Sequence, residues 1–111
     1  MDIKRKEMYA EAIKFYIEKE EKEVARAYLY LLGDDSSAGL FGFLHDFYVD
    51  AYAEGEDYGF MLAQEIIKEA RERGCYKLIS TKRHDSGKRM QKLYEKLGFK
   101  GFGLEFRIDF Y

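Results

Sequence analysis

The sequence has no proline, no tryptophan and a single cysteine, Cys75. A chain of this length at average usage would carry about five prolines, so their absence indicates a biased genome or a designed chain. One cysteine excludes an internal disulfide bond and a cysteine-based zinc cluster, and a free thiol is typical of a reducing, cytoplasmic setting. His45 and His84 lack the spacing to carboxylates that a metal centre needs, so we expect no metal.

Long apolar runs and a strong net charge are also missing. No run approaches the ~20 apolar residues of a membrane-spanning helix, and residues 1–7 lack the apolar stretch of a secretory signal. The formal net charge is −2, from 19 basic and 21 acidic residues, which gives no overall attraction to nucleic acid. We therefore expect neither membrane nor nucleic-acid partners. The 47% hydrophobic and 36% charged composition predicts one globular domain, residues 1–111.

The first half of the chain predicts one helix and two strands. From residue 2 to about residue 22, apolar residues recur at three- and four-residue steps between charged ones, as in an amphipathic helix. Residues 24–32 and 40–52 are rich in β-branched and aromatic residues and predict two antiparallel strands joined by a glycine-bounded turn. Strict alternation places one set of side chains on a single face of the second strand: Phe41, Phe43, His45, Phe47 and Val49.

The second half predicts two helices and two strands. An apolar stripe over residues 58–73, followed by Gly74, indicates a helix with a glycine C-cap. A short buried strand at 76–81, a helix at 86–97 and an alternating strand at 103–111 follow. Two strand–helix–strand connections favour a partly parallel sheet. The predicted fold class is α/β, with a mixed sheet of about five to six strands and three helices.

Three segments carry the chemistry. Residues 47–59 run from a strand through an acidic, glycine-containing loop into a helix N-terminus, which favours an anion. Gly74-Cys75-Tyr76-Lys77 leads into the next strand, and Tyr94-Glu95-Lys96-Leu97-Gly98-Phe99 ends the last helix. Over residues 24–111 this succession resembles the GNAT superfamily of N-acetyltransferases, and the Tyr94–Phe99 block is its most specific part.

The resemblance implies a GNAT-like fold with acetyl-CoA as co-substrate. Acetyl-CoA would lie between two parallel strands that separate, here residues 47–49 and 76–80. Backbone groups of Phe47, Tyr48 and Val49 would bind the acetyl and pantetheine portions, and an N–H near Val49 would polarise the thioester carbonyl. The pyrophosphate would lie on the loop formed by Glu54, Gly55, Glu56, Asp57, Tyr58 and Gly59. Lys88 and Arg89, in a basic stretch, would meet the 3′-phosphate.

The resemblance also implies catalytic roles. Tyr94 occupies the place of the acid that protonates the leaving thiolate. A lysine-like acceptor amine has a pKa of about 10.4 and needs help to lose its proton near neutral pH. His45 and Asp46 are the candidate bases, with histidine the better suited by its ordinary pKa. The acceptor would be a small-molecule or peptide amine, the transfer direct, and residues 103–111 would pair two protomers into a homodimer.

The acidic loop departs from the family and supports an alternative. Glu54 stands where the family has a basic or amide residue, Asp57 replaces its first glycine, Glu56 adds a third carboxylate, and Gly59 alone matches. Each like-charge pair near 4 Å costs ~1 kcal/mol in water and ~4 kcal/mol at an effective dielectric of 20. Asp57 would instead cap the helix. Acetyl-CoA binding is then weakened or lost. The alternative is a non-catalytic, degenerate or designed GNAT-fold domain that self-associates or has no activity.

Overall fold

Four strands and two helices form the regular structure of the residues that the computed structural model describes, 1–33, 39–51, 57–81 and 87–111, with the side chains of 87–89 left out. In chain order they are β1 (Glu11–Lys19), β2 (Lys22–Leu32), β3 (Phe41–Val49), α1 (Tyr58–Glu72), β4 (Leu78–Ser80) and α2 (Gly87–Leu97). The α/β fold class with a mixed sheet is confirmed, although the described residues hold four strands and two helices rather than five to six and three. They group into two compact units, residues 1–80 and 81–111.

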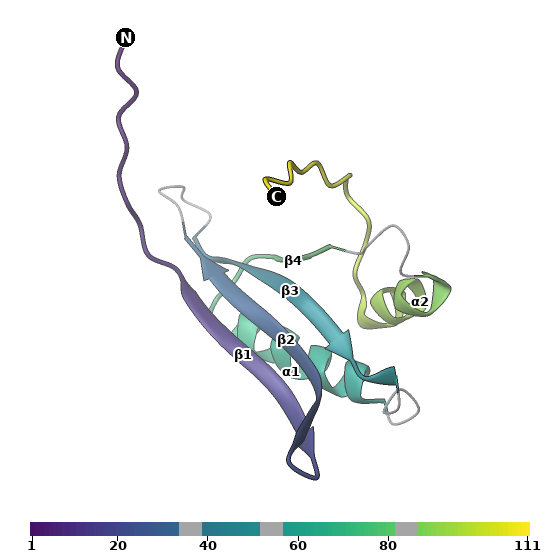
Figure 1. Ribbon diagram of the computed structural model, residues 1–111. Helices are drawn as coiled ribbons and strands as arrows, with labels where there is room; N and C mark the ends of the chain where they lie inside the picture. Colours follow the sequence, from purple (N-terminus) through teal and green to yellow (C-terminus); the bar gives the residue numbers. More distant parts are fainter. Residues whose placement is uncertain (34–38, 52–56, 82–86) are drawn as a thin grey trace. The chain divides into compact units, whose positions relative to one another are not determined.

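The sheet belongs to the first unit, where helix α1 covers one of its faces (Figure 1). The strand order is β1-β2-β3-β4, with antiparallel pairs except for the parallel pair β3–β4. Helix α1 connects these two parallel strands, as the pattern predicts. Leu29 of β2, Leu44 of β3 and Ile66 of α1 are the largest fully buried side chains. The core therefore lies between the sheet and α1.

The N-terminal segment corrects the first expectation. The helix predicted at residues 2–22 is wrong, because Glu11–Lys19 forms the edge strand β1. Ile13, Phe15 and Ile17 are half-buried and alternate with exposed residues. Ile13 and Ile17 are four residues apart, so they fit helical spacing as well as alternation. The segment forms a strand rather than a helix because it pairs with β2 along the whole of β1. This pairing satisfies the backbone N–H and C=O groups that face β2 and buries one face of the strand.

The C-terminal segment corrects the second expectation. Residues 98–111 contain no strand, whereas alternation predicts one over 103–111. The apolar side chains of the segment are 78–94% exposed: Phe102, Leu104, Phe106, Ile108 and Phe110. Alternation suits a strand, but a strand forms only where a neighbouring backbone completes its hydrogen bonds. The described part of the second unit contains no strand to provide that neighbour.

The predicted helices at 58–73 and 86–97 are confirmed as α1 and α2. Leu62, Ala63, Ile66 and Ala70 of α1 are buried and form the predicted apolar stripe. Within the described ranges, neither helix has the length and apolarity that crossing a membrane requires.

Candidate functional site

Strand β3 bulges at Asp46. Tyr28 of β2 lies opposite His45, and Arg26 lies opposite Tyr48, so one β2 residue faces two β3 residues between these pairs. The backbone of Asp46 has φ 53°, in the left-handed region that residues other than glycine rarely adopt. An extra residue of this kind bends its strand and increases the local twist. The bulge therefore redirects the second half of β3.

The parallel pairing between β3 and β4 stops just before the bulge. Residues 42–44 pair with residues 78–80, and the N–H of Gly42 donates to the carbonyl oxygen of Lys77 at 2.9 Å. Strand β3 then continues through residues 45–49 beyond the last pair. The predicted donor-binding residues Phe47, Tyr48 and Val49 lie in this continuation. Their backbone is thus separated from β4 pairing, an arrangement that suits hydrogen bonding to an extended ligand.

The bulge also changes which side chains share a face. Tyr28 and Arg26 are two residues apart in β2 and lie on one face. His45 and Tyr48 lie opposite them, so His45 shares its face with Tyr48 and not with Val49. Strict alternation through β3 is therefore wrong after His45, because the inserted residue reverses the order of the two faces.

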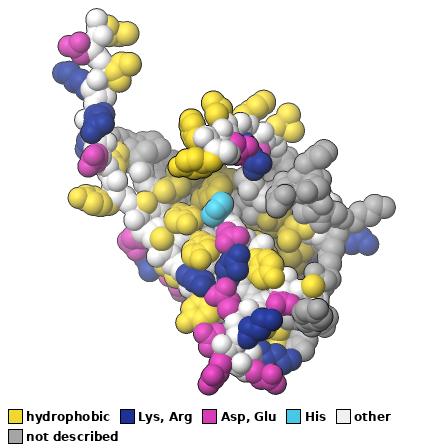
Figure 2. All heavy atoms as spheres, viewed as in Figure 1, with side chains coloured by type: hydrophobic (Ala, Val, Ile, Leu, Met, Phe, Trp, Pro, Cys, Tyr) yellow, Lys and Arg dark blue, Asp and Glu magenta, His cyan; other side chains and the backbone are white. Residues whose placement is uncertain are grey.

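Aromatic rings surround His45 on the sheet face opposite α1. The His45 ring centroid lies 6.1 Å from that of Tyr30 and 6.0 Å from that of Phe43, and Tyr28 stacks beside Tyr30 at 6.3 Å. Figure 2 shows this face, where the cyan histidine lies among hydrophobic side chains with acidic and basic side chains beside it. The His45 side chain is exposed, so its imidazole is accessible for proton transfer.

Arg26 connects the bulge to β2. Its Nε donates to Asp46 Oδ2 at 2.9 Å, its second guanidinium nitrogen donates to Glu23 Oε2 at 3.5 Å, and its Cζ lies 4.7 Å from the ring centroid of Tyr48. The hydrogen bond that Arg26 donates to the Asp46 carboxylate raises the pKa of Arg26. The sequence prediction missed this residue. The sequence feature that could have indicated its role is its position as a single arginine within the apolar run of β2.

Asp57 is the N-cap residue just before helix α1 and has φ 56° and ψ 21°. Its carbonyl oxygen accepts the N–H of Met61 at 3.1 Å, but its side chain makes no capping hydrogen bond. The predicted side-chain cap is therefore wrong, because capping requires an extended backbone at that position. The first turn, which includes Tyr58 and Gly59, carries no acidic residue. The rest of the predicted loop lies outside the described residues: Glu54, Gly55 and Glu56.

Tyr94 is held at the end of α2 by the residues that follow it. Gly98 has φ 94°, which lets the N–H of Phe99 turn back and donate to the Tyr94 carbonyl oxygen at 2.9 Å. The two rings lie 5.2 Å apart. Tyr94 is 9% exposed, and its hydroxyl donates to the carbonyl oxygen of Thr81 at 3.4 Å. The Tyr94–Phe99 block is thus a helix ending that fixes one tyrosine.

The other predicted residues of this unit begin the same helix. Lys88 and Arg89 belong to the first turn of α2, and their side chains lie outside the description. Tyr94, Lys88 and Arg89 are all in residues 81–111, whereas His45, Asp46 and the donor strand are in the first unit.

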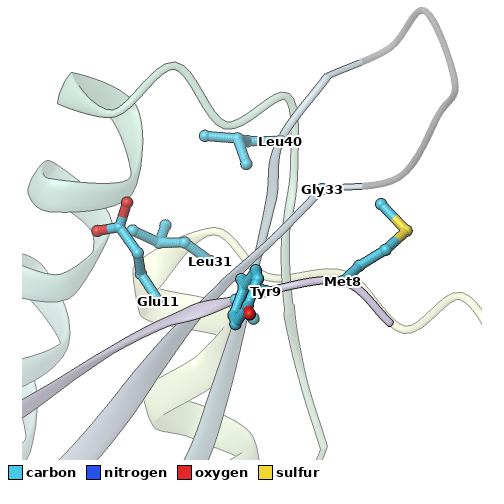
Figure 3. A pocket seen from close by; sticks show the side chains of 7 residues that line it. Met8, Tyr9, Glu11, Leu31, Gly33 and Leu40 are labelled. Atoms are coloured by element: carbon cyan, nitrogen blue, oxygen red, sulfur yellow. The ribbon is translucent and has the colours of Figure 1, made fainter. Parts of the chain in front are cut away.

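A hollow of about 360 Å³ lies where β1 begins and β2 ends (Figure 3). Met8, Leu31 and Leu40 contribute apolar side chains to it. The carboxylate of Glu11, which also lines it, accepts a hydrogen bond from Arg73 at 2.9 Å. Of the predicted site residues that the structure describes, none lines this hollow. It is therefore separate from the candidate site on β3.

The sequence comparisons point to one family. The profile of the acetyltransferase (GNAT) family matches residues 2–99. The chain is 34% identical over 68 residues to the glucosamine 6-phosphate N-acetyltransferase of Trypanosoma brucei brucei, which covers 61% of this chain and 44% of that protein. It is 33% identical over 72 residues to the probable glucosamine 6-phosphate N-acetyltransferase 2 of Oryza sativa subsp. japonica, which covers 65% and 41%. The chain spans less than half the length of these curated relatives.

Solved structures show the same fold. A Trypanosoma brucei acetyltransferase superposes with a TM-score of 0.77 at 26% identity, covering 88% of this chain and 68% of that one. The Arabidopsis thaliana glucosamine-6-phosphate N-acetyltransferase gives 0.81 at 21% identity, covering 90% and 67%. A predicted acetyltransferase from Clostridium acetobutylicum, solved with acetyl-CoA, gives 0.72 at 16% identity, covering 88% and 64%. Since the family profile matches residues 2–99 of 111, the chain belongs to the acetyltransferase (GNAT) family.

Proposed function

We propose that the chain is an N-acetyltransferase domain that transfers an acetyl group from acetyl-CoA to the primary amine of a small molecule. The observation that carries the proposal is the break in the sheet at Asp46, where β3 bulges and continues beyond its last pair with β4. This break leaves an extended backbone segment without a β4 partner. Membership of the GNAT family supports acetyl-CoA as the donor.

Three segments would hold the donor. Backbone groups of Phe47, Tyr48 and Val49 would bind its acetyl and pantetheine portions, with an N–H near Val49 placed to polarise the acetyl carbonyl. The N-terminus of α1 would hold the pyrophosphate, because its amides and dipole favour an anion. The residues present fit this role in part. The backbone of Asp57 has the left-handed conformation that suits the family's glycine, and its side chain does not cap the helix.

The remaining donor contacts fall on the loop and on α2. Glu54, Gly55, Glu56, Tyr58 and Gly59 would surround the pyrophosphate, and Lys88 and Arg89 would meet the 3′-phosphate. When bound, acetyl-CoA supplies an acetyl group on an activated thioester. The carboxylates of the loop weaken this binding without removing the backbone donors.

His45 is the proposed base and Tyr94 the proposed acid. The exposed imidazole of His45 has the side-chain type that titrates nearest neutral pH, so it can accept a proton from the acceptor amine. Asp46 is the less available base, because its carboxylate already accepts a hydrogen bond from Arg26 at 2.9 Å. The Tyr94 hydroxyl would protonate the leaving thiolate.

The proposed acceptor is a small primary amine, and an amino sugar phosphate is the first class to test. Two curated relatives are named as glucosamine 6-phosphate N-acetyltransferases. The rings around His45 give an apolar surface with hydroxyl groups at its edge, which suits a small polar ligand. In an acetylation assay with glucosamine 6-phosphate as acceptor, the control compound is N-acetylglucosamine 6-phosphate. It has the same ring and phosphate but no free amine, so it should not be acetylated.

The test is calorimetric titration with acetyl-CoA of the parent and of the double variant Glu54→Arg with Asp57→Gly. We expect weak binding by the parent and at least about tenfold tighter binding by the variant, since relief of each like-charge contact contributes ~1 kcal/mol or more. The matched control is Glu20→Arg with Glu21→Gly in the β1–β2 turn. It makes the same kinds of change away from the candidate site, at positions with φ 54° and 63° that, like Asp57, lie in the left-handed region, and it should leave the affinity unchanged.

Two results would count against the proposal. No binding by the parent or the double variant up to millimolar acetyl-CoA would favour the non-catalytic alternative. Binding without acetylation of any primary amine would retain the donor site but overturn the transferase.

We also propose that residues 1–111 act as one domain, in the cytoplasm, as a homodimer. The family profile spans both compact units, which supports one domain. The free thiol of Cys75 supports a reducing compartment. The exposed apolar side chains of residues 102–110 support self-association, because large apolar groups left exposed close together are typical of an interaction site.

A further inference from the structure

The guanidinium of Arg26, on β2, contacts both the bulge of β3 and the strand beyond it. Its guanidinium binds Asp46 at 2.9 Å and Glu23 at 3.5 Å and lies 4.7 Å from the Tyr48 ring centroid. Its side chain is 31% exposed. It is thus a half-buried cation that contacts two consecutive parts of β3, the bulge residue and the strand beyond it.

Among the described strands, only β2 pairs with β3 beyond the bulge, where Tyr48 lies opposite Arg26 and Val49 opposite Ala25. The parallel pairing of β3 with β4 ends at the pair Leu44–Ser80. At the far end, the N–H of Asp50 donates to the carbonyl oxygen of Val24 at 2.8 Å. Between these two points, Asp46 takes a conformation that a residue with a side chain rarely adopts. A strained residue of this kind persists only when its surroundings determine it.

We propose that Arg26 is a positioning residue, which holds the bulge at Asp46 and thereby orients the backbone of residues 47–49 toward the acyl donor. The role rests on the proposed function. Arginine suits this position because its guanidinium is planar. The same group can hydrogen-bond a carboxylate at its edge and stack on an aromatic ring with its face. Direct binding of a phosphate by Arg26 is disfavoured, since two carboxylates already neutralise it.

The experiment compares the amide hydrogen exchange of three variants by NMR, without ligand. Arg26→Met keeps the apolar stem and removes the three guanidinium contacts, with Asp46, Glu23 and the Tyr48 ring. We expect exchange at residues 46–49 to rise about fivefold relative to residues 42–44, the scale of a partly exposed ion pair. Arg26→Lys keeps the charge without the planar group and should restore protection in part.

The matched control is Arg73→Met. Arg73 also binds two carboxylates, Glu69 at 2.8 Å and Glu11 at 2.9 Å, but it lies after α1. Exchange at residues 46–49 should stay at the parent level in this variant. The same proteins are then titrated with acetyl-CoA, and Arg26→Met alone should raise the Kd, by a factor similar to the change in exchange.

The outcomes separate the two proposals. If Arg26→Met changes exchange at residues 46–49 no more than at residues 42–44, relative to the parent, the positioning role is overturned. Increased exchange at 46–49 with an unchanged Kd would overturn it as well. Failure of the parent to bind acetyl-CoA refutes the proposed function instead. The exchange data still show in that case whether Arg26 holds the bulge.

Discussion

At the scale of single residues, Gly42 occupies a crowded position between β3 and its neighbours. It pairs with Leu78 in the parallel ladder. A Cβ at this position would lie 2.9 Å from Leu78 Cδ1 and 3.1 Å from Leu29 Cδ1. A Cβ at residue 42 would therefore force the ends of both leucine side chains to move in a packed core, and the absence of a side chain at Gly42 lets β3 and β4 pack closely here.

We predict that Gly42→Ala lowers the free energy of unfolding by about 1–3 kcal/mol, the usual cost of overpacking a core. Urea unfolding measures the change. Gly101→Ala is the control, since a Cβ there meets nothing within 4 Å, and it should change stability by no more than about 0.5 kcal/mol. Equal losses in the two variants would show that the contact with Leu78 is not the cause.

A second residue-scale prediction concerns Tyr94. Its hydroxyl makes a long hydrogen bond of 3.4 Å to Thr81, so Tyr94→Phe should cost about 1 kcal/mol or less in stability. If the hydroxyl protonates the leaving thiolate, kcat should fall at least about tenfold while the KM for acetyl-CoA stays near that of the parent. Steady-state kinetics separates the two constants. Tyr9→Phe, at an exposed tyrosine, is the control, and an unchanged kcat in Tyr94→Phe would remove this residue from the mechanism.

The backbone conformations of single residues in the candidate site could not be predicted from the sequence. The residue types of His45, Asp46 and the donor strand were visible in the chain. The positive φ of Asp46 and Asp57 was not, because aspartate occurs far more often with negative φ. The role of Arg26 depends on the register between β2 and β3, which local periodicity does not determine.

At the scale of elements, the turn between β1 and β2 places two glutamates in a left-handed backbone conformation that favours Asn and Gly. Glu20 and Glu21 have φ 54° and 63°, the backbone of a type I′ turn, which favours Asn-Gly. Replacing Glu20 with Asn and Glu21 with Gly should raise the free energy of unfolding by about 0.5–1 kcal/mol. Thermal or urea unfolding measures the gain.

The reversed pair, Glu20→Gly with Glu21→Asn, is the control for that turn. It introduces the same two residue types but keeps a side chain at the second left-handed position. It should gain less than Asn-Gly. A larger gain from the reversed pair would contradict the turn assignment.

The sequence pattern predicts the two helices more reliably than it predicts the edge strand β1 or the C-terminal segment. Helices α1 and α2 have apolar stripes long enough to exclude a strand, and both were predicted. Strand β1 was not, because an edge strand with one solvated face carries charges at spacings that also fit a helix. The predicted strand at 103–111 has the right alternation but lacks a neighbouring strand among the described residues of its unit.

At the scale of the whole molecule, the exposed apolar side chains of residues 102–110 predict self-association. Replacing Phe106 and Ile108 with Lys should shift the protein from dimer to monomer, because it places charge among these apolar side chains. Sedimentation analysis would then report about the chain mass of 13.1 kDa. The control, Glu105→Lys with Asp109→Lys, reverses two charges in the same segment, leaves its apolar residues in place and should keep the dimer. A monomeric parent would contradict the proposal.

The family and the α/β class could be predicted from the whole sequence because they rest on the order of several elements. Of the segments that carry the resemblance, residues 47–49 lie on β3, residues 58 and 59 on α1, and residues 94–97 at the end of α2. The number of strands is harder to predict from the sequence, because a segment forms a strand only where the backbone of a neighbouring segment pairs with it.

The parallel pair of β3 and β4 also has a consequence for folding kinetics. Strands β1, β2 and β3 are neighbours in sequence as well as in the sheet, so their contacts close short loops. Strand β4 joins β3 only after the α1 segment has been spanned, and it does so through residues 42–44 and 78–80. Such distant contacts form late, because the longer loop costs more entropy. A substitution at Gly42 should therefore act mainly on the unfolding rate, and the edge of the break at Asp46 should be completed last on the folding pathway.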